Sequence, residues 1–132
     1  MRIKVVAAVI GVWIVMAAVP SWAHHSPSAI FDMTKPISVT GTLTKVDWIN
    51  PHIVILMDAK SSDGKVEHWT FESNPPSWYR RVGVTRADFA KAIGQTVTVG
   101  GVRARNGSLF GYLLKLQLPD GTSLDLVVGD IK

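Results

Sequence analysis

The stretch ISVTGTLTKVDW, residues 37–48, alternates apolar and polar side chains and predicts a long β-strand. Up to residue 43, apolar residues and one glycine hold the odd-numbered positions, whereas Val46 and Trp48 continue the apolar set at even-numbered positions. Successive side chains of a strand point to opposite faces, so this change of phase predicts a β-bulge near Lys45.

Two more strands are expected directly after this one. Asn50-Pro51-His52 ends the first strand, because proline restricts the residue before it and has no amide proton to donate. The nearly continuous apolar run over residues 53–58 predicts a second strand that is partly buried on both faces. Ser62-Asp63-Gly64 is typical of a hairpin turn and predicts a third strand over residues 66–72.

The second half of the chain begins with helical signals and returns to strands. Residues 77–82 predict a short helix that a glycine ends, and residues 85–94 predict a second helical turn. Phe89 and Ile93 are four residues apart and are expected to share one helix face. Strands separated by Asn-Gly and Pro-Asp-Gly turns follow at residues 96–105, 109–118 and 123–128.

The order of three strands, a helical connection and two or three strands predicts a mainly β domain. Together with the long bulged first strand, it is typical of a small OB-like antiparallel barrel of five to six strands, with a short helix between strands 3 and 4. An open antiparallel sandwich is the alternative. We expect one barrel domain over residues 37–132, preceded by an extended and loosely held segment, residues 24–36, which Phe31 would pin.

Residues 1–23 have the order of a secretory signal peptide. Arg2 and Lys4 precede fifteen residues, 5–19, without a charged or strongly polar side chain. As a helix these rise only about 22 Å, less than the roughly 30 Å hydrocarbon core of a membrane. Small residues before position 24 predict cleavage after Ala23, which leaves 132 − 23 = 109 residues. We therefore expect a periplasmic or secreted protein with no stable membrane span; a buried helix of a cytosolic domain is the weaker alternative.

Composition excludes several classes of function. The net charge of +4 falls to 12 − 10 = +2 when Arg2 and Lys4 are removed. The sequence contains no run of five like charges, so it predicts neither a nucleic-acid partner nor a polybasic membrane patch. The chain has no cysteine, so its stability must come from the core, and a cysteine nucleophile is excluded. No G-x-S-x-G motif and no glycine-rich phosphate loop occurs, so a binding module is favoured over an enzyme.

Several short motifs resemble those of a family of small exported bacterial proteins of uncharacterised function. The resemblance implies an exported location, a compact fold and a set of histidine positions, but it implies no activity. The motifs extend over nearly the whole mature chain: HHS at 24–26, VTGTL at 39–43, VDW at 46–48, NPH at 50–52, DGK at 63–65, WTFE at 69–72 and LPDG at 118–121.

The mature N-terminus is a candidate metal site. After cleavage, the amine and imidazole of His24 can chelate one metal ion. With His25, the amine, the intervening amide nitrogen and the second imidazole can bind in one plane, a geometry that suits Cu(II). The cofactor is left open: copper is one candidate, other transition metals are further options, and a solvated tail without metal is the alternative.

His52 is the candidate third ligand, because a loop at the end of the first strand would hold its side chain at the barrel rim. A polar rim residue bonded to a nearby backbone group is the alternative for this position. His68 is a second candidate, on the strand face opposite Trp69 and Phe71, with Glu72 four residues further along the same face. If His24 met His52, its amine and the two imidazoles would form a site of the histidine-brace type. Exported enzymes use such sites to oxidise polysaccharides, and this enzyme class is a weaker hypothesis.

A second function class rests on aromatic residues. Trp48, Trp78 and Tyr79 could form a rim that binds a small ligand or an envelope protein. The protein would then be a metal-free OB-like module for a peptide, a glycan or an envelope protein. The alternative is that Trp78 and Val82 pack inward from a helix whose two arginines stay in solvent. Export argues against nucleic acid as a partner.

Overall fold

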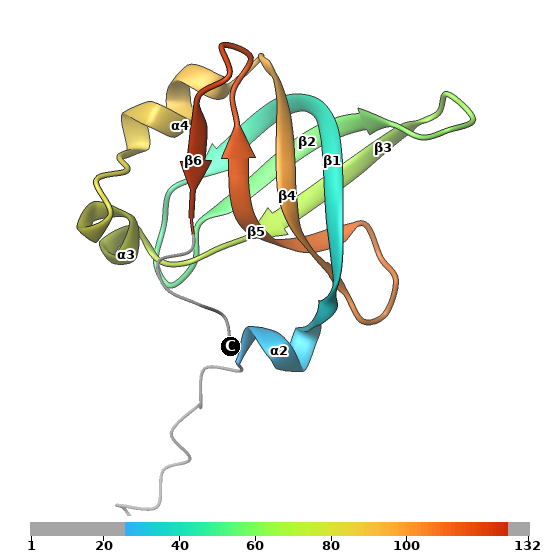
Figure 1. Cartoon of the computed structure of the whole chain (residues 1–132), viewed down its shortest axis with the longest axis horizontal. Helices are drawn as coiled ribbons and strands as arrows, with labels where there is room; N and C mark the ends of the chain where they lie inside the picture. Colours follow the sequence, from blue (N-terminus) through green and yellow to red (C-terminus); the bar gives the residue numbers. More distant parts are fainter. Residues whose placement is uncertain (1–25, 127–132) are drawn as a thin grey trace, which may run out of the picture.

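The computed structural model describes residues 26–126, which form a closed β-barrel with short helices beside it (Figure 1). Six strands and three short helices make up this part of the chain. In chain order they are α2 (Pro27–Ile30), β1 (Phe31–Asp47), β2 (Val54–Lys60), β3 (Val66–Glu72), α3 (Pro76–Arg81), α4 (Arg86–Ala92), β4 (Thr96–Ala104), β5 (Phe110–Gln117) and β6 (Ser123–Asp125).

The barrel closes because β3 and β5 pair in addition to the consecutive strands. β1 pairs antiparallel with both β2 and β4, and β4 pairs antiparallel with β5. The short parallel pairing of β3 with β5 completes a ring in the order β1-β2-β3-β5-β4, and β6 is an extra strand on β5. The predicted small OB-like barrel with its helical connection after β3 is therefore confirmed, and an open sandwich is wrong.

The predicted bulge in the first strand is also confirmed. The pairing of β1 with β2 shifts between Leu43 and Lys45. At this point the Leu43 amide donates to the Gln95 carbonyl oxygen at 3.0 Å, and the Leu43 carbonyl oxygen accepts from Gly94 at 2.8 Å. The bulge of β1 thus forms backbone hydrogen bonds with the segment that leads from α4 into β4.

The N-terminal part of β1 differs from the prediction. The strand begins at Phe31, and Phe31 lies opposite Ala104 of β4 and is only 1% exposed. Its ring lies 5.0 Å from that of Phe110 and 5.4 Å from that of Tyr112. The expected extended and loosely held segment is therefore a short helix followed by a paired strand, because a buried aromatic cluster holds Phe31.

The two helices between β3 and β4 lie together on one side of the barrel (Figure 1). α3 buries Tyr79 completely, and α4 buries Phe89 and Ala92. A capping box between Thr85 and Asp88 begins α4. The prediction that Ile93 shares the buried face with Phe89 is wrong, because α4 ends at Ala92 and Ile93 is 44% exposed.

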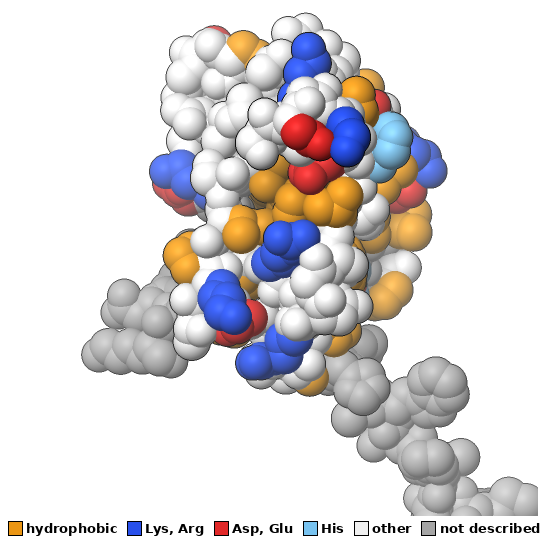
Figure 2. All heavy atoms as spheres, turned by 90° about the vertical axis from the view of Figure 1, so that its right-hand side faces the viewer, with side chains coloured by type: hydrophobic (Ala, Val, Ile, Leu, Met, Phe, Trp, Pro, Cys, Tyr) orange, Lys and Arg blue, Asp and Glu red, His pale blue; other side chains and the backbone are white. Residues whose placement is uncertain are grey.

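The surface of the described residues shows no continuous basic area on the face drawn in Figure 2. Lys and Arg side chains on that face are separated by neutral and hydrophobic atoms, and several lie beside acidic groups. Within residues 26–126, no helix is both long enough and apolar enough to cross a membrane.

Candidate functional site

His52 is oriented by a carboxylate at one end of the barrel. Its Nδ1 atom forms an ion-pair contact with Oε1 of Glu72, the last residue of β3. A carboxylate can only accept, so Nδ1 carries the proton and donates. Nε2, on the far side of the ring, is then free to act as a lone-pair donor, as in metal sites where a carboxylate fixes the orientation of a ligating imidazole.

The exposure of the pair suits a site at the protein surface. The side chain of His52 is 38% exposed and that of Glu72 is 20% exposed. The backbone also joins the two segments, because the amide of Ser73 donates to the carbonyl oxygen of Ile53 at 2.9 Å. The imidazole is therefore held in place while it stays accessible to solvent.

Asn74 and Tyr112 extend this polar group, and we call the four residues His52, Glu72, Asn74 and Tyr112 the end cluster. Tyr112 lies opposite Glu72 in the β3–β5 pairing, and its hydroxyl donates to Oδ1 of Asn74 at 2.8 Å. Burial raises the pKa of Tyr112, and the negative charge of Glu72 raises it further. The phenol stays protonated at neutral pH and serves as a hydrogen-bond donor there.

The N-terminal segment reaches the barrel beside the end cluster. Phe31 packs on the ring of Tyr112, and α2 lies at the lower end of the barrel as drawn in Figure 1. The guanidinium of Arg105 donates from Nε and Nη2 to the carbonyl oxygen of Ser28, both at 3.1 Å. The chain just after His24 and His25 is thus held against the barrel, while those two histidines lie outside the described residues.

His68, the second histidine candidate, pairs with a carboxylate of the neighbouring strand. Its Nδ1 lies 2.7 Å from Oδ1 of Asp58, the residue directly opposite it on β2, and its side chain is 80% exposed. Among residues 26–126, no three His, Cys, Asp or Glu side chains are grouped closely enough to hold a metal ion. A metal site that uses His52 therefore needs ligands from outside this part of the chain.

The predicted aromatic rim loses Tyr79 to the core, and its two tryptophans are partly buried. Tyr79 is completely buried and its hydroxyl shares a hydrogen bond with that of Ser73, so it offers nothing to a ligand. Trp48 packs against the rings of Tyr79 and Phe89, at 5.6 and 5.4 Å. Trp78 is half-buried and packs against the core edge-on to Tyr79, while the arginines of α3 stay exposed. The helix thus follows the alternative in which Trp78 and Val82 pack inward while the two arginines stay in solvent.

The sequence contained His52 and Glu72, but no sequence signal paired them. Glu72 was considered as a neighbour of His68 on the same strand face, and neither Asn74 nor Tyr112 was linked to His52. The alternation of β3 places Glu72 on the outward face, and a register for β2 and β3 would have placed it near His52.

Comparison with known proteins gives a family but no activity. The family model described as "Family of unknown function (DUF6152)" matches residues 11–113. The match extends over most of the chain and includes every residue of the end cluster. No curated protein matches the chain.

Proposed function

The chain belongs to this family of unknown function, in agreement with its resemblance to uncharacterised exported proteins, and we propose that it is a small periplasmic module that binds Cu(II) or another transition metal ion. The ligands are the amine and imidazole of the mature N-terminus, with His24 and His25, and the imidazole of His52. One observation carries the proposal: the contact from Glu72 to Nδ1 of His52 leaves Nε2 available at the end of the barrel to which the N-terminal segment is attached.

Export supports the proposal because only cleavage creates the amine ligand. The charged start, the short apolar run and the small residues before position 24 are the three parts of a signal peptide. Cleavage after Ala23 would make His24 the first residue. The ligands are imidazole and amine nitrogens, and Cu(II) binds such ligands more tightly than the other divalent first-row metals do.

The first experiment determines the N-terminus. The full chain is produced with its own leader, and the protein recovered from the periplasm is analysed by intact-mass spectrometry. The expected mass is that of residues 24–132. A protein that stays in the cytoplasm, or a cut at another bond, would remove the amine of His24 and contradict the proposal.

The second experiment measures the metal. Cu(II) is titrated into the mature protein under competition with a chelator, and the coordination is followed by electron paramagnetic resonance. We expect one tight site and a large loss of affinity for His25→Ala and for His52→Ala, because each removes a ligand. Glu72→Gln removes only a ligand-orienting contact, so a loss of about tenfold is expected there.

His68→Ala is the matched control. Its imidazole is also oriented by a carboxylate, but it lies four residues, about 13 Å, before Glu72 on β3. Copper affinity should stay unchanged in this variant. Equal affinities for the wild type, His24→Ala and His25→Ala would refute the N-terminal site, and an unchanged spectrum in His52→Ala would remove the barrel from it.

A further inference from the structure

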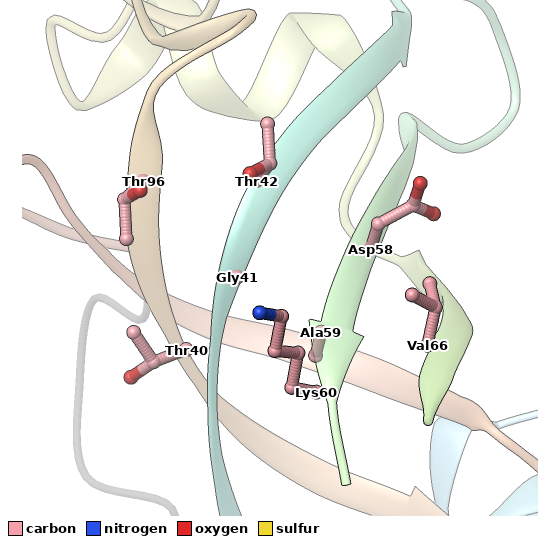
Figure 3. Close-up of a pocket in the computed structure, with 8 residues that line it drawn as sticks. All are labelled: Thr40, Gly41, Thr42, Asp58, Ala59, Lys60, Val66 and Thr96. Carbon is pink, nitrogen blue, oxygen red and sulfur yellow. The ribbon is translucent and has the colours of Figure 1, made fainter. Parts of the chain in front are cut away.

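A hollow on the outer face of the barrel is lined by none of the end-cluster residues. It has a volume of about 420 Å³ and crosses the neighbouring strands β4, β1, β2 and β3 (Figure 3). A volume of this size is typical of small-molecule sites, which take roughly 300–1,000 Å³. Gly41 and Ala59 form its centre, and its other lining residues are Thr40, Thr42, Thr96, Asp58, Lys60 and Val66.

Three threonines, Thr40, Thr42 and Thr96, line one half of this hollow, which we call the threonine groove. Thr42 lies opposite Thr96 in the β1–β4 pairing, so two hydroxyl-bearing side chains stand next to each other. Thr40 already shares a hydrogen bond of 2.8 Å with Thr98, which fixes its orientation. Each hydroxyl can donate one hydrogen bond and accept others, so this half can serve donors and acceptors alike.

The other half carries one group of each charge. Lys60 extends its ammonium group across the groove toward Gly41 (Figure 3), and no carboxylate of residues 26–126 lies within ion-pair distance of it. Asp58 uses Oδ1 to pair with His68, which leaves its second oxygen as an acceptor. The two charges offset each other, so an anion attracted by Lys60 would be repelled by Asp58.

Two further features limit what the groove can bind. β1 and β2 are each paired on both sides at this point, so neither of these two strands offers a free edge to the backbone of a peptide. No aromatic side chain from the described residues 26–126 lines the groove, so this part of the chain offers a nucleic-acid base nothing to stack on. Val66, whose side chain lies at the border, is 55% exposed and supplies an apolar contact.

We propose that the threonine groove binds a neutral saccharide of two or three sugar rings. Such a ligand presents many hydroxyl groups that donate and accept, has no net charge and has an apolar C–H face for Val66. The groove offers the matching set: neutral hydroxyls, one carboxylate acceptor, one ammonium donor and one exposed apolar side chain. This inference is independent of the metal site and uses none of its ligands.

The experiment is an NMR titration of ¹⁵N-labelled mature protein. Maltotriose, cellotriose and triacetylchitotriose are the neutral probes, and trigalacturonate and inorganic phosphate are the anionic ones. With at least one neutral probe, we expect saturable shifts confined to amides of residues 40–42, 58–60 and 96. Shifts of these amides with anionic probes alone, or with no probe at millimolar concentration, would overturn the proposal.

Three variants test whether the groove itself is the binding site. Thr42→Val keeps the side-chain shape and removes one hydroxyl, so the dissociation constant should rise about tenfold for the lost hydrogen bond. Thr96→Trp fills the hollow from an exposed position and should abolish binding. Thr70→Val on β3 is the control outside the groove and should leave binding unchanged. Unchanged binding in both groove variants would refute the assignment.

Discussion

Phe31→Ala tests whether the start of β1 is part of the barrel core. Phe31 is 1% exposed and its ring contacts those of Phe110 and Tyr112. Replacement of a buried phenylalanine by alanine costs about 3–5 kcal/mol, because apolar contacts are lost and a cavity remains. A domain of this size has a total free energy of unfolding of about 5–15 kcal/mol, so the variant should lose a substantial fraction of its stability.

The assay is urea unfolding of the mature chain, followed by tryptophan fluorescence and circular dichroism. With an m-value of about 1–3 kcal/mol/M, a loss of about 3 kcal/mol lowers the midpoint by roughly 1–3 M. Ile30→Ala is the control one residue earlier, since Ile30 is 40% exposed, and its effect should stay below about 1 kcal/mol. An effect of Phe31→Ala as small as that of Ile30→Ala would refute the reasoning and make the segment peripheral.

Three other predictions concern the stability and the titration of the barrel. Gly101→Ala should lower the free energy of unfolding by about 1–3 kcal/mol in urea unfolding, because the new Cβ would collide with the carbonyl oxygen of Tyr112. Gly100→Ala, with a Cβ only in contact with Lys115 at 3.4 Å, should be close to neutral, and equal losses in the two variants would contradict this. The two tyrosines of the chain should resist ionisation near pH 10 in an absorbance titration, because burial raises the pKa of both Tyr79 and Tyr112. Since the unfolded state then releases phenolic protons that the folded state keeps, stability should fall as the pH rises above about 10, and reversible ionisation of the native protein there would contradict it. Thr85→Ala should lower stability by roughly 1 kcal/mol in thermal unfolding through loss of the capping box, and an unchanged melting temperature would show that the cap contributes nothing.

Most strands and turns were predictable because their signals are local. Residues 66–72 alternate along the sequence and form β3 with Trp69 and Phe71 buried, as expected. Gly64, Gly107 and Gly121 all have positive φ at the predicted turns. Each follows a polar residue in a hairpin signal of the sequence. The bulge near Lys45 was visible as a change of phase.

The candidate site was predictable only in part. The sequence singled out His52, because a histidine after Asn50-Pro51 had to lie in a loop at the end of a strand. It did not show that Glu72 is its partner or that His68 pairs with Asp58, because both contacts join residues of different segments. Tyr79 was taken as a surface aromatic because a six-residue helix has too little periodicity to show which side is buried.

By itself, the sequence determined the strand order, the turns, the bulge and the expectation of export, because each depends on neighbouring residues. Tertiary structure alone decided that β1 begins as early as Phe31, that Glu72 orients His52 and that three threonines, Asp58 and Lys60 share one groove. These features depend on barrel closure and strand register, which bring together residues that are distant in the chain. The same closure buries Tyr79, so a residue that looked available for binding instead stabilises the fold.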